Sequence, residues 1–285
     1  MADEIPFPPQ GYTAVLVFDD PTPNTIILKR IVEFPMTVAA KCTDLEGEEM
    51  NDFVDLILLI ARKMLSAYKH KEAYHSEERR LEAKFKADPA APRVHSQELF
   101  EEFDVFVVQI KSTLDHMVKI MRPMLGRKWT MYTFADKGMG VLTSLQRNTG
   151  KQYVGRVKMM EAFVFTQRNF EWLEAVIATR DRANHNLGGG LKVETFAVFQ
   201  NPDSTVNFPM WTAEQRLATM MDITWENFFG LVEDFIMIAL HFRFKIDEWG
   251  MFRDHQPLSS KRGSWKVMPK AEADALIAKV GVTPL

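Results

Sequence analysis

The polar segment 179–186 brings guanidinium, carboxyl and imidazole groups together within eight residues. Arg180 offers a planar fork of N–H donors that matches a phosphate group, and His185 can carry a proton near neutral pH. Residues five positions apart diverge in an ideal helix, but a frayed helix end or the start of a loop lets both side chains reach one anion. The segment therefore has the residues needed for phosphodiester chemistry.

A purely structural role accounts for the same residues. Arg180 and Arg182 can complement the negative end of a helix dipole, and His185 can help to cap the helix. The sequence leaves both interpretations open.

Other polar pairs have simpler interpretations than catalysis. A di-metal helical bundle needs two Glu-x-x-His pairs on facing helices, whereas this chain has one, Glu72 and His75, on a charged helix. Asp115 and His116 are sequence neighbours and point about 100° apart on a helix, so we expect separate contacts for each. We therefore predict no metal site.

Two glycine-rich stretches, 138–140 and 188–190, lack the spacing and the following lysine of a phosphate-binding loop. We expect turns at both places. No cofactor is predicted.

Apolar residues at helical spacing predict four long helices. The first starts near residue 49, continues past Tyr74 and breaks at Pro89, and the second starts at the N-cap Ser96 and ends at Pro123. The third covers residues 156–184 and the fourth 212–245, with Thr212 as its cap. The clearest apolar stripe, on the second helix, is Leu99, Phe103, Phe106, Ile110, Leu114, Met117 and Met121. The fold class is therefore mainly α, a four-helix up-and-down bundle with small β-hairpin additions.

The hairpins are predicted from β-branched runs around turn residues. Residues 12–18 and 25–28 form one pair, and residues 193–199 and 205–208 form another around the turn 201–204. We expect the second hairpin to pair with the N-terminal strands.

These elements divide the chain into three parts. An N-terminal β-rich segment, 1–48, packs on the bundle. The helical bundle covers 49–246 and carries the hairpin near 191–210. A C-terminal extension, 247–285, contains a short helix at 271–279.

Composition limits the classes of function. The formal net charge is -3, which gives no global positive field to attract duplex nucleic acid or anionic lipid. Cys42 is the single cysteine, so a reducing, cytoplasmic compartment is expected. The start of the chain is acidic and proline-rich rather than signal-like, and the apolar stretch 53–60 is too short to span a bilayer.

The predicted bundle with Arg180, the polar Asp181 directly after it and His185 resembles the HEPN superfamily, whose signature is an arginine and a histidine with four to six residues between them. The resemblance covers about residues 50 to 245. It implies a metal-independent endoribonuclease, acting on single-stranded RNA at a site shared by the two chains of a homodimer. An alternative is a non-catalytic HEPN-like module for dimerisation or for binding a nucleotide or partner.

The resemblance also implies roles for individual residues. His185 would transfer protons, Arg180 would neutralise charge on the phosphorane and Asp181 would orient one of them. Arg182 and Asn184 are candidate substrate-binding donors. An antitoxin or regulatory protein is a candidate partner, and the polar stretch with Lys261, Arg262, Trp265 and Lys266 is either an RNA-guiding surface or a solvated tail.

Overall fold

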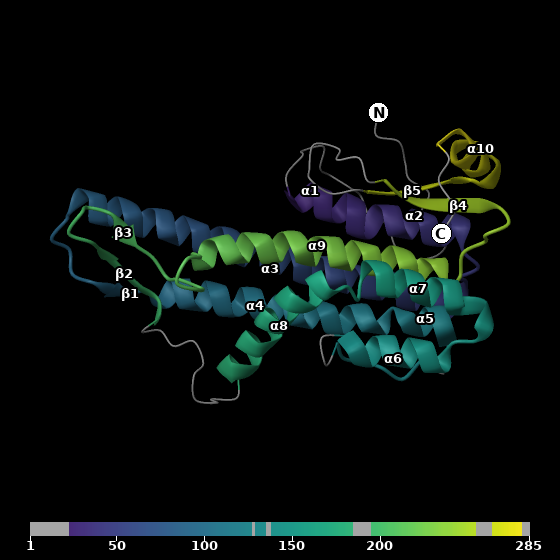
Figure 1. Ribbon diagram of the computed structural model, residues 1–285, viewed down its shortest axis with the longest axis horizontal. Helices are drawn as coiled ribbons and strands as arrows, with labels where there is room; N and C mark the ends of the chain where they lie inside the picture. The colour runs from purple at the N-terminus through teal and green to yellow at the C-terminus, as the bar shows by residue number, and fades with distance from the viewer. Residues whose placement is uncertain (1–22, 127–128, 135–137, 185–194, 255–263, 281–285) are drawn as a thin grey trace.

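The core is built on long helices that lie lengthwise beside one another (Figure 1). They are α3 (Gly47–Ala87), α4 (Gln97–Lys119) and α9 (Leu217–His241). The computed structural model describes residues 23–126, 129–134, 138–184, 195–254 and 264–280. The prediction of a mainly helical protein with small antiparallel strand pairs is confirmed. Within these residues, no helix is both long and apolar enough to cross a bilayer.

Helix α4 forms where its sequence predicts. The Ser96 hydroxyl accepts a hydrogen bond from the Leu99 amide at 3.2 Å, which satisfies a free N–H of the first turn. The predicted stripe from Leu99 to Met121 is buried throughout. Pro123 does not end this helix, however. It lies in the next short helix, α5 (Met121–Leu125), where a proline in the first turn needs no amide partner.

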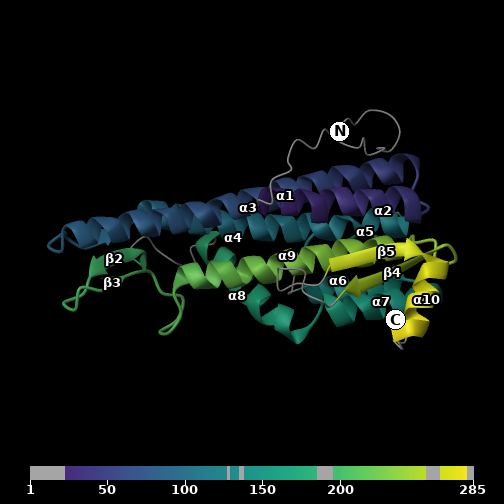
Figure 2. The same ribbon diagram turned by 90° about the horizontal axis from the view of Figure 1, so that it is seen from above.

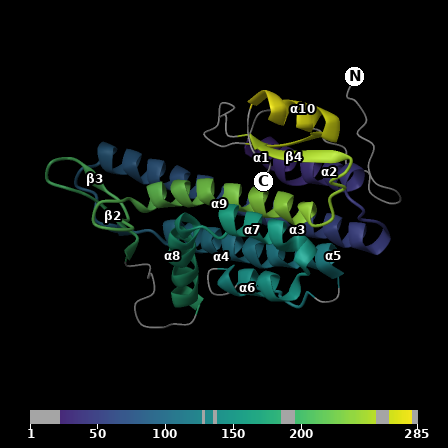
Figure 3. The same cartoon turned by 45° about the vertical axis from the view of Figure 1, so that its right-hand side comes forward.

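The third predicted helix is instead two helices, α7 (Val154–Phe163) and α8 (Gln167–Asn184). At the break, the Thr166 hydroxyl accepts from the Asn169 amide, and the Asn169 side chain donates to the Val164 carbonyl at 2.8 Å. These bonds cap both helix ends and allow the chain to turn. Helix α8 consequently runs at a steep angle to the long helices (Figures 1 and 3).

Helix α9 is the central element because it is buried on nearly every side. It begins at Leu217 rather than at Thr212. The Thr212 hydroxyl accepts from the Gln215 amide at 3.1 Å and so stabilises a turn before the helix.

The last residue of α9, His241, provides a pH-dependent test of this packing. Burial lowers the pKa of His241 from 6.5 to about 4, and the nearby Arg156 guanidinium adds to the effect. The unfolded chain therefore binds a proton that the folded protein does not, and stability falls as pH drops from about 6.5 toward 4. His241→Phe, which keeps a ring stacked on Phe244, should remove roughly 2 to 3 kcal/mol of this pH dependence. Urea unfolding of both proteins at a series of pH values measures this dependence. If the free energy of unfolding changes equally with pH in both proteins, the prediction is wrong.

The N-terminal segment differs from its prediction. Residues 25–28, predicted as a strand, lie in a helical run made of α1 (Pro23–Ile27), the π-helix η1 (Leu28–Glu33) and α2 (Phe34–Cys42). Ile27 and Ile31 are buried one helical turn apart, so tertiary burial overrides the strand preference of β-branched residues. Residues 12–18 lie outside the described residues.

The second hairpin is confirmed, but its neighbour is not the one expected. Strands β2 (Ala197–Gln200) and β3 (Val206–Asn207) pair antiparallel around a turn closed by the Asn201 amide and the Thr205 carbonyl. Strand β2 also pairs with β1 (Val94–His95), just before α4. Among the described residues, β1 rather than the N-terminal segment is the neighbour of β2, and the described part of that segment is helical.

The C-terminal extension forms an antiparallel pair, β4 (Trp249–Asp254) and β5 (Ser264–Pro269), followed by α10 (Lys270–Val280). Figure 2 shows these elements gathered at one end of the molecule. The final helix is confirmed. Trp265 is buried in β5 rather than exposed on a basic tail, so it is not available to stack on RNA, and Lys261 and Arg262 lie outside the described residues.

Candidate functional site

The polar segment singled out in the sequence belongs to helix α8. Arg180, Asp181, Arg182 and Asn184 lie in its final described turns. The structure describes the backbone of these four residues but not their side chains, and His185 lies outside the described residues. The meeting of Arg180 and His185 on one phosphate therefore stays a prediction.

The preceding part of α8 sets the direction of this segment. Trp172, Leu173 and Val176 are buried, and the Trp172 indole donates to the Asn169 side-chain oxygen at 3.1 Å. Thr179, also buried, donates to the Ala175 carbonyl at 2.7 Å. From this anchored face, the helix carries its last turn away from the long helices (Figures 1 and 3).

The end of α8 has an electrostatic requirement. Helix dipoles place partial negative charge at the C-terminal end, so an anion bound here needs positive side chains. Arg180 and Arg182 are the residues of this turn with that charge. They fit a role in phosphate binding and equally fit a role in stabilising the helix end.

A second polar group, the α3–α9 cluster, consists of Lys71, Glu72 and His75 on α3 and Asp222 on α9. The Lys71 ammonium donates to Glu72 at 2.7 Å and to Asp222 at 2.9 Å. The His75 Nε2 lies 3.0 Å from the same Asp222 oxygen. The cluster joins two helices whose residues are about 150 positions apart in the chain.

The charges of this cluster stabilise one another. Burial by itself would lower the pKa of Lys71, but its hydrogen bonds to Glu72 and Asp222 raise that pKa above its usual value. Partial burial would raise the pKa of Asp222, yet hydrogen bonds from His75 and Lys71 lower it. The ammonium and the carboxylates therefore stay ionised and paired at neutral pH, which suits an interhelical link better than a proton-transfer site.

On the same part of α3, Tyr74 and Glu78 are also buried, and within the described residues each has one side-chain oxygen without a hydrogen-bond partner. Arg216 donates to one Glu78 oxygen at 2.7 Å, while the other oxygen and the Tyr74 hydroxyl have no hydrogen-bond partner in the described part of the chain. Burial raises the pKa of Glu78, and Arg216 opposes that shift. The ion pair between Glu78 and Arg216 therefore extends the link between α3 and the start of α9.

The Glu72 and His75 side chains are thus occupied by Lys71 and Asp222. In the described ranges, no three His, Cys, Asp or Glu side chains are grouped as metal ligands would be. His70 points elsewhere, to Glu102 on α4, at 2.6 Å.

Asp115 and His116 make separate contacts, as predicted. Asp115 accepts from the Lys111 ammonium at 2.6 Å and from the Phe134 amide at 2.7 Å, whereas His116 lies beside Lys119. The first glycine-rich stretch, 138–140, is a turn only at its first residue, because Gly140 already lies in helix α6 (Met139–Asn148). Gly138 has a φ of 86°, and a Cβ there would lie 2.5 Å from the Phe134 ring. The second stretch, 188–190, lies outside the described residues.

Comparison with models of protein families, with curated proteins and with solved structures finds no match.

Two adjacent acids of α9 hold the terminal parts of the chain. Arg30 in η1 makes a two-pronged ion pair with Glu233, with its Nε 2.7 Å from Oε1. Asp234 accepts from the Trp265 indole at 2.9 Å and from the Arg253 guanidinium at 2.8 Å. Both carboxyl groups are buried. They connect η1 and the β4–β5 pair to the central helix.

Asp234 provides a pH test with the opposite sign to that of His241. Burial raises the pKa of Asp234 to about 7 despite Arg253 and Trp265, compared with 3.8 for an exposed aspartate. The folded protein holds a proton that the unfolded chain releases, so this group lowers the free energy of unfolding as pH rises through this interval, by about 3 to 4 kcal/mol. Relative to Asp234→Asn, the wild type should lose stability between about pH 4 and 7 in urea unfolding. If the difference in free energy of unfolding between the wild type and Asp234→Asn does not change with pH, the prediction is wrong.

Sequence inspection found the Glu-x-x-His pair but not its partners. Lys71 carries no distinguishing signal in a run of charged residues, and Asp222 lies on another helix. The adjacent Glu233 and Asp234 inside an otherwise apolar helix were the available signal for the buried acids, because an acid on an apolar face needs a partner.

Proposed function

We propose that this protein is a HEPN-like, metal-independent endoribonuclease that cleaves single-stranded RNA. In this proposal α3, α4, α8 and α9 correspond to the four helices of the HEPN bundle, with α8 tilted. The observation that supports it best is that the Arg180–Asn184 segment lies on the turn of α8 that points away from the long helices. A large substrate can approach such a turn, and a second chain can add a matching segment.

The proposed reaction is attack of a ribose 2′-hydroxyl on the adjacent phosphorus. The 2′-oxygen forms a bond to phosphorus while the bond from phosphorus to the 5′-oxygen breaks, leaving a 2′,3′-cyclic phosphate and a 5′-hydroxyl. His185 accepts the 2′-hydroxyl proton, and the imidazolium of the partner chain's motif protonates the leaving oxygen. Arg180 neutralises charge on the phosphorane, Asp181 orients one of these groups, and Arg182 and Asn184 hold the neighbouring nucleotide.

The proposal includes a homodimer in the cytoplasm, with an antitoxin or regulatory protein as a candidate partner. A shared site makes the rate per chain depend on concentration. We expect the specific activity to fall when the protein is diluted below its dimer dissociation constant. Sedimentation velocity at the same concentrations would show whether the loss follows dissociation.

Incubation of the purified protein with a labelled single-stranded RNA in EDTA tests the activity. Cleavage that yields cyclic phosphate and 5′-hydroxyl ends is expected. Intact RNA would overturn the nuclease proposal. RNA that is retained but not cleaved would instead favour the non-catalytic HEPN-like binding module.

A further inference from the structure

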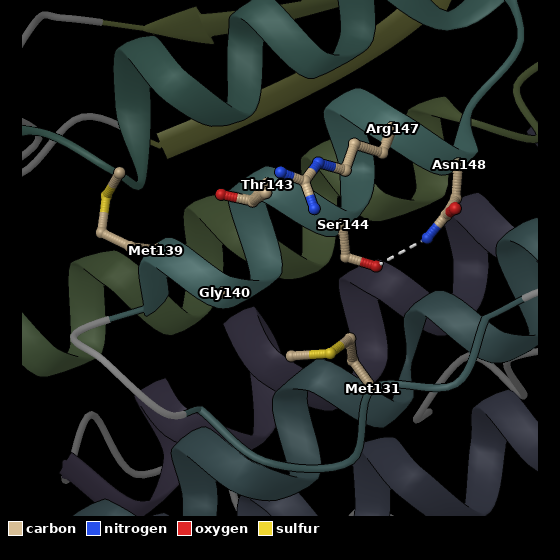
Figure 4. A pocket seen from close by; sticks show the side chains of 7 residues that line it. All are labelled: Met131, Met139, Gly140, Thr143, Ser144, Arg147 and Asn148. Atoms are coloured by element: carbon tan, nitrogen blue, oxygen red, sulfur yellow. Dashed lines mark hydrogen bonds between the residues drawn. The ribbon is translucent and has the colours of Figure 1, made fainter.

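A hollow opens between helix α6 (Met139–Asn148) and the segment 129–134 that precedes it. Figure 4 shows Ser144 and Asn148 on the side of α6 that faces Met131, and Arg147 reaching toward Thr143 one turn earlier. Positions 140, 143, 144 and 147 recur at steps of three and four, so they share one face of the helix. This face is the wall of the hollow.

The opposite face of α6 is firmly packed. Val141, Leu142 and Leu145 are buried in the core. The Gly138 turn before the helix lies against Phe134 and Phe165, which stack on each other. The hollow is therefore held by the core on one side rather than by the exposed surface alone.

The wall of the hollow is rich in hydrogen-bond donors. Within the part of the chain that the structure describes, the Arg147 guanidinium and the Thr143 hydroxyl have no ion pair or hydrogen bond. The Ser144 oxygen accepts from the Asn148 amide at 3.0 Å, which leaves its own O–H to donate outward. Among the described residues, the lining contains no carboxylate. Such a set of donors selects an anion, and the guanidinium fork fits a phosphate best.

Met131 and Met139 are the apolar side chains of the lining. Figure 4 shows Met131 opposite Ser144 and Met139 apart from it, at the start of α6. Thioether side chains are polarizable and pack well against aromatic rings. A ligand with a phosphate beside a planar ring can contact both the donors of α6 and Met131, whereas a free phosphate would leave Met131 without contact. In single-stranded RNA the bases are unstacked and can reach such a surface, but in a duplex they cannot.

We infer that the α6 hollow binds one nucleotide of single-stranded RNA, with the phosphate on Arg147, Thr143 and Ser144 and the base against Met131. This inference rests on the proposed ribonuclease function. In Figures 1 and 3, α6 and the end of α8 lie on the same side of the long helices. The hollow is then a second contact for the strand that is cleaved at α8, and it contributes affinity and position rather than chemistry.

Binding of a fluorescent 2′-O-methyl oligoribonucleotide, which cannot undergo 2′-hydroxyl attack, tests the inference without cleavage. Arg147→Gln should weaken binding about ten-fold and reduce the salt dependence by the equivalent of one phosphate contact. Arg79→Gln on distant α3 is the matched control, since it removes an exposed arginine outside the hollow and should leave affinity unchanged. Because Arg147 is exposed and has no ion pair or hydrogen bond to the residues that the structure describes, thermal unfolding of its variant should match the wild type.

The outcomes separate this inference from the proposed function. Wild-type protein that neither binds nor cleaves single-stranded RNA overturns both. If the wild type and Arg147→Gln bind RNA with the same affinity and salt dependence, the inferred nucleotide site is wrong, while the proposed ribonuclease function is unaffected. If Arg147→Gln and Arg79→Gln lose RNA affinity equally, the loss comes from the change in overall charge, and the α6 hollow is not a binding site.

Discussion

Replacing His185 with alanine should slow RNA cleavage by about 10²–10⁴-fold, because general acid–base catalysis contributes on this scale. Arg180→Ala should slow it by about 10²–10³-fold, since it removes a donor aimed at charge that develops in the transition state. Both losses should fall on kcat more than on KM. Initial rates with a labelled single-stranded RNA in EDTA measure them.

Arg168→Ala is the matched control on the same helix. Arg168 is exposed near the start of α8, at the other end of the helix from Arg180, so the rate should stay within about two-fold of the wild type. Arg182→Ala and Asn184→Ala should raise KM more than they lower kcat, since they are proposed to hold substrate. Cleavage that survives unchanged in both Arg180→Ala and His185→Ala would exclude the α8 segment as the site.

The largest expected effect on stability comes from Arg30→Ala. It removes the guanidinium that pairs with Glu233, a residue only 4% exposed. Breaking a buried ion pair from one side typically costs about 3 to 5 kcal/mol, because the remaining charge has lost its main compensation. Urea unfolding near pH 7 should show a loss of this size, and the N-terminal helical segment should become more sensitive to proteolysis.

Two controls distinguish the ion pair from other effects. Lys29→Ala removes an adjacent exposed cation and should change stability by less than about 0.5 kcal/mol. The double variant Arg30→Met, Glu233→Met should recover most of the loss, since replacing both charges with apolar side chains leaves no uncompensated charge. If Arg30→Ala is as stable as the wild type, Arg30 is not the group that compensates Glu233.

Local features of the sequence were enough to predict several elements. Helix α4 followed from one uninterrupted stripe and the Ser96 cap, the end of α3 from Pro89, and the β2–β3 hairpin from the turn at 201–204. Each of these depends on contacts between residues a few positions apart. The candidate segment on α8 was found for the same reason, as a cluster of side-chain types within eight residues.

One error arose where the deciding contacts were distant, and another where two local signals compete. Residues 25–28 have strand preference but are helical, because Ile27 and Ile31 enter the core on one helix face. The break between α7 and α8 depends on Thr166 and Asn169, whose capping role competes with a helical pattern that continues on both sides.

The sequence by itself determined that the chain is mainly helical and where α4 and the β2–β3 hairpin form, and it singled out the residues of α8 that we propose act on phosphate. Only the tertiary structure decided that Asp222 joins Lys71 and His75, that Arg30 pairs with Glu233, and that Trp265 is buried against Asp234. The physical reason is sequence separation. Periodicity and capping act within a few residues, whereas a buried charge can be paired by any segment that the packed core brings beside it.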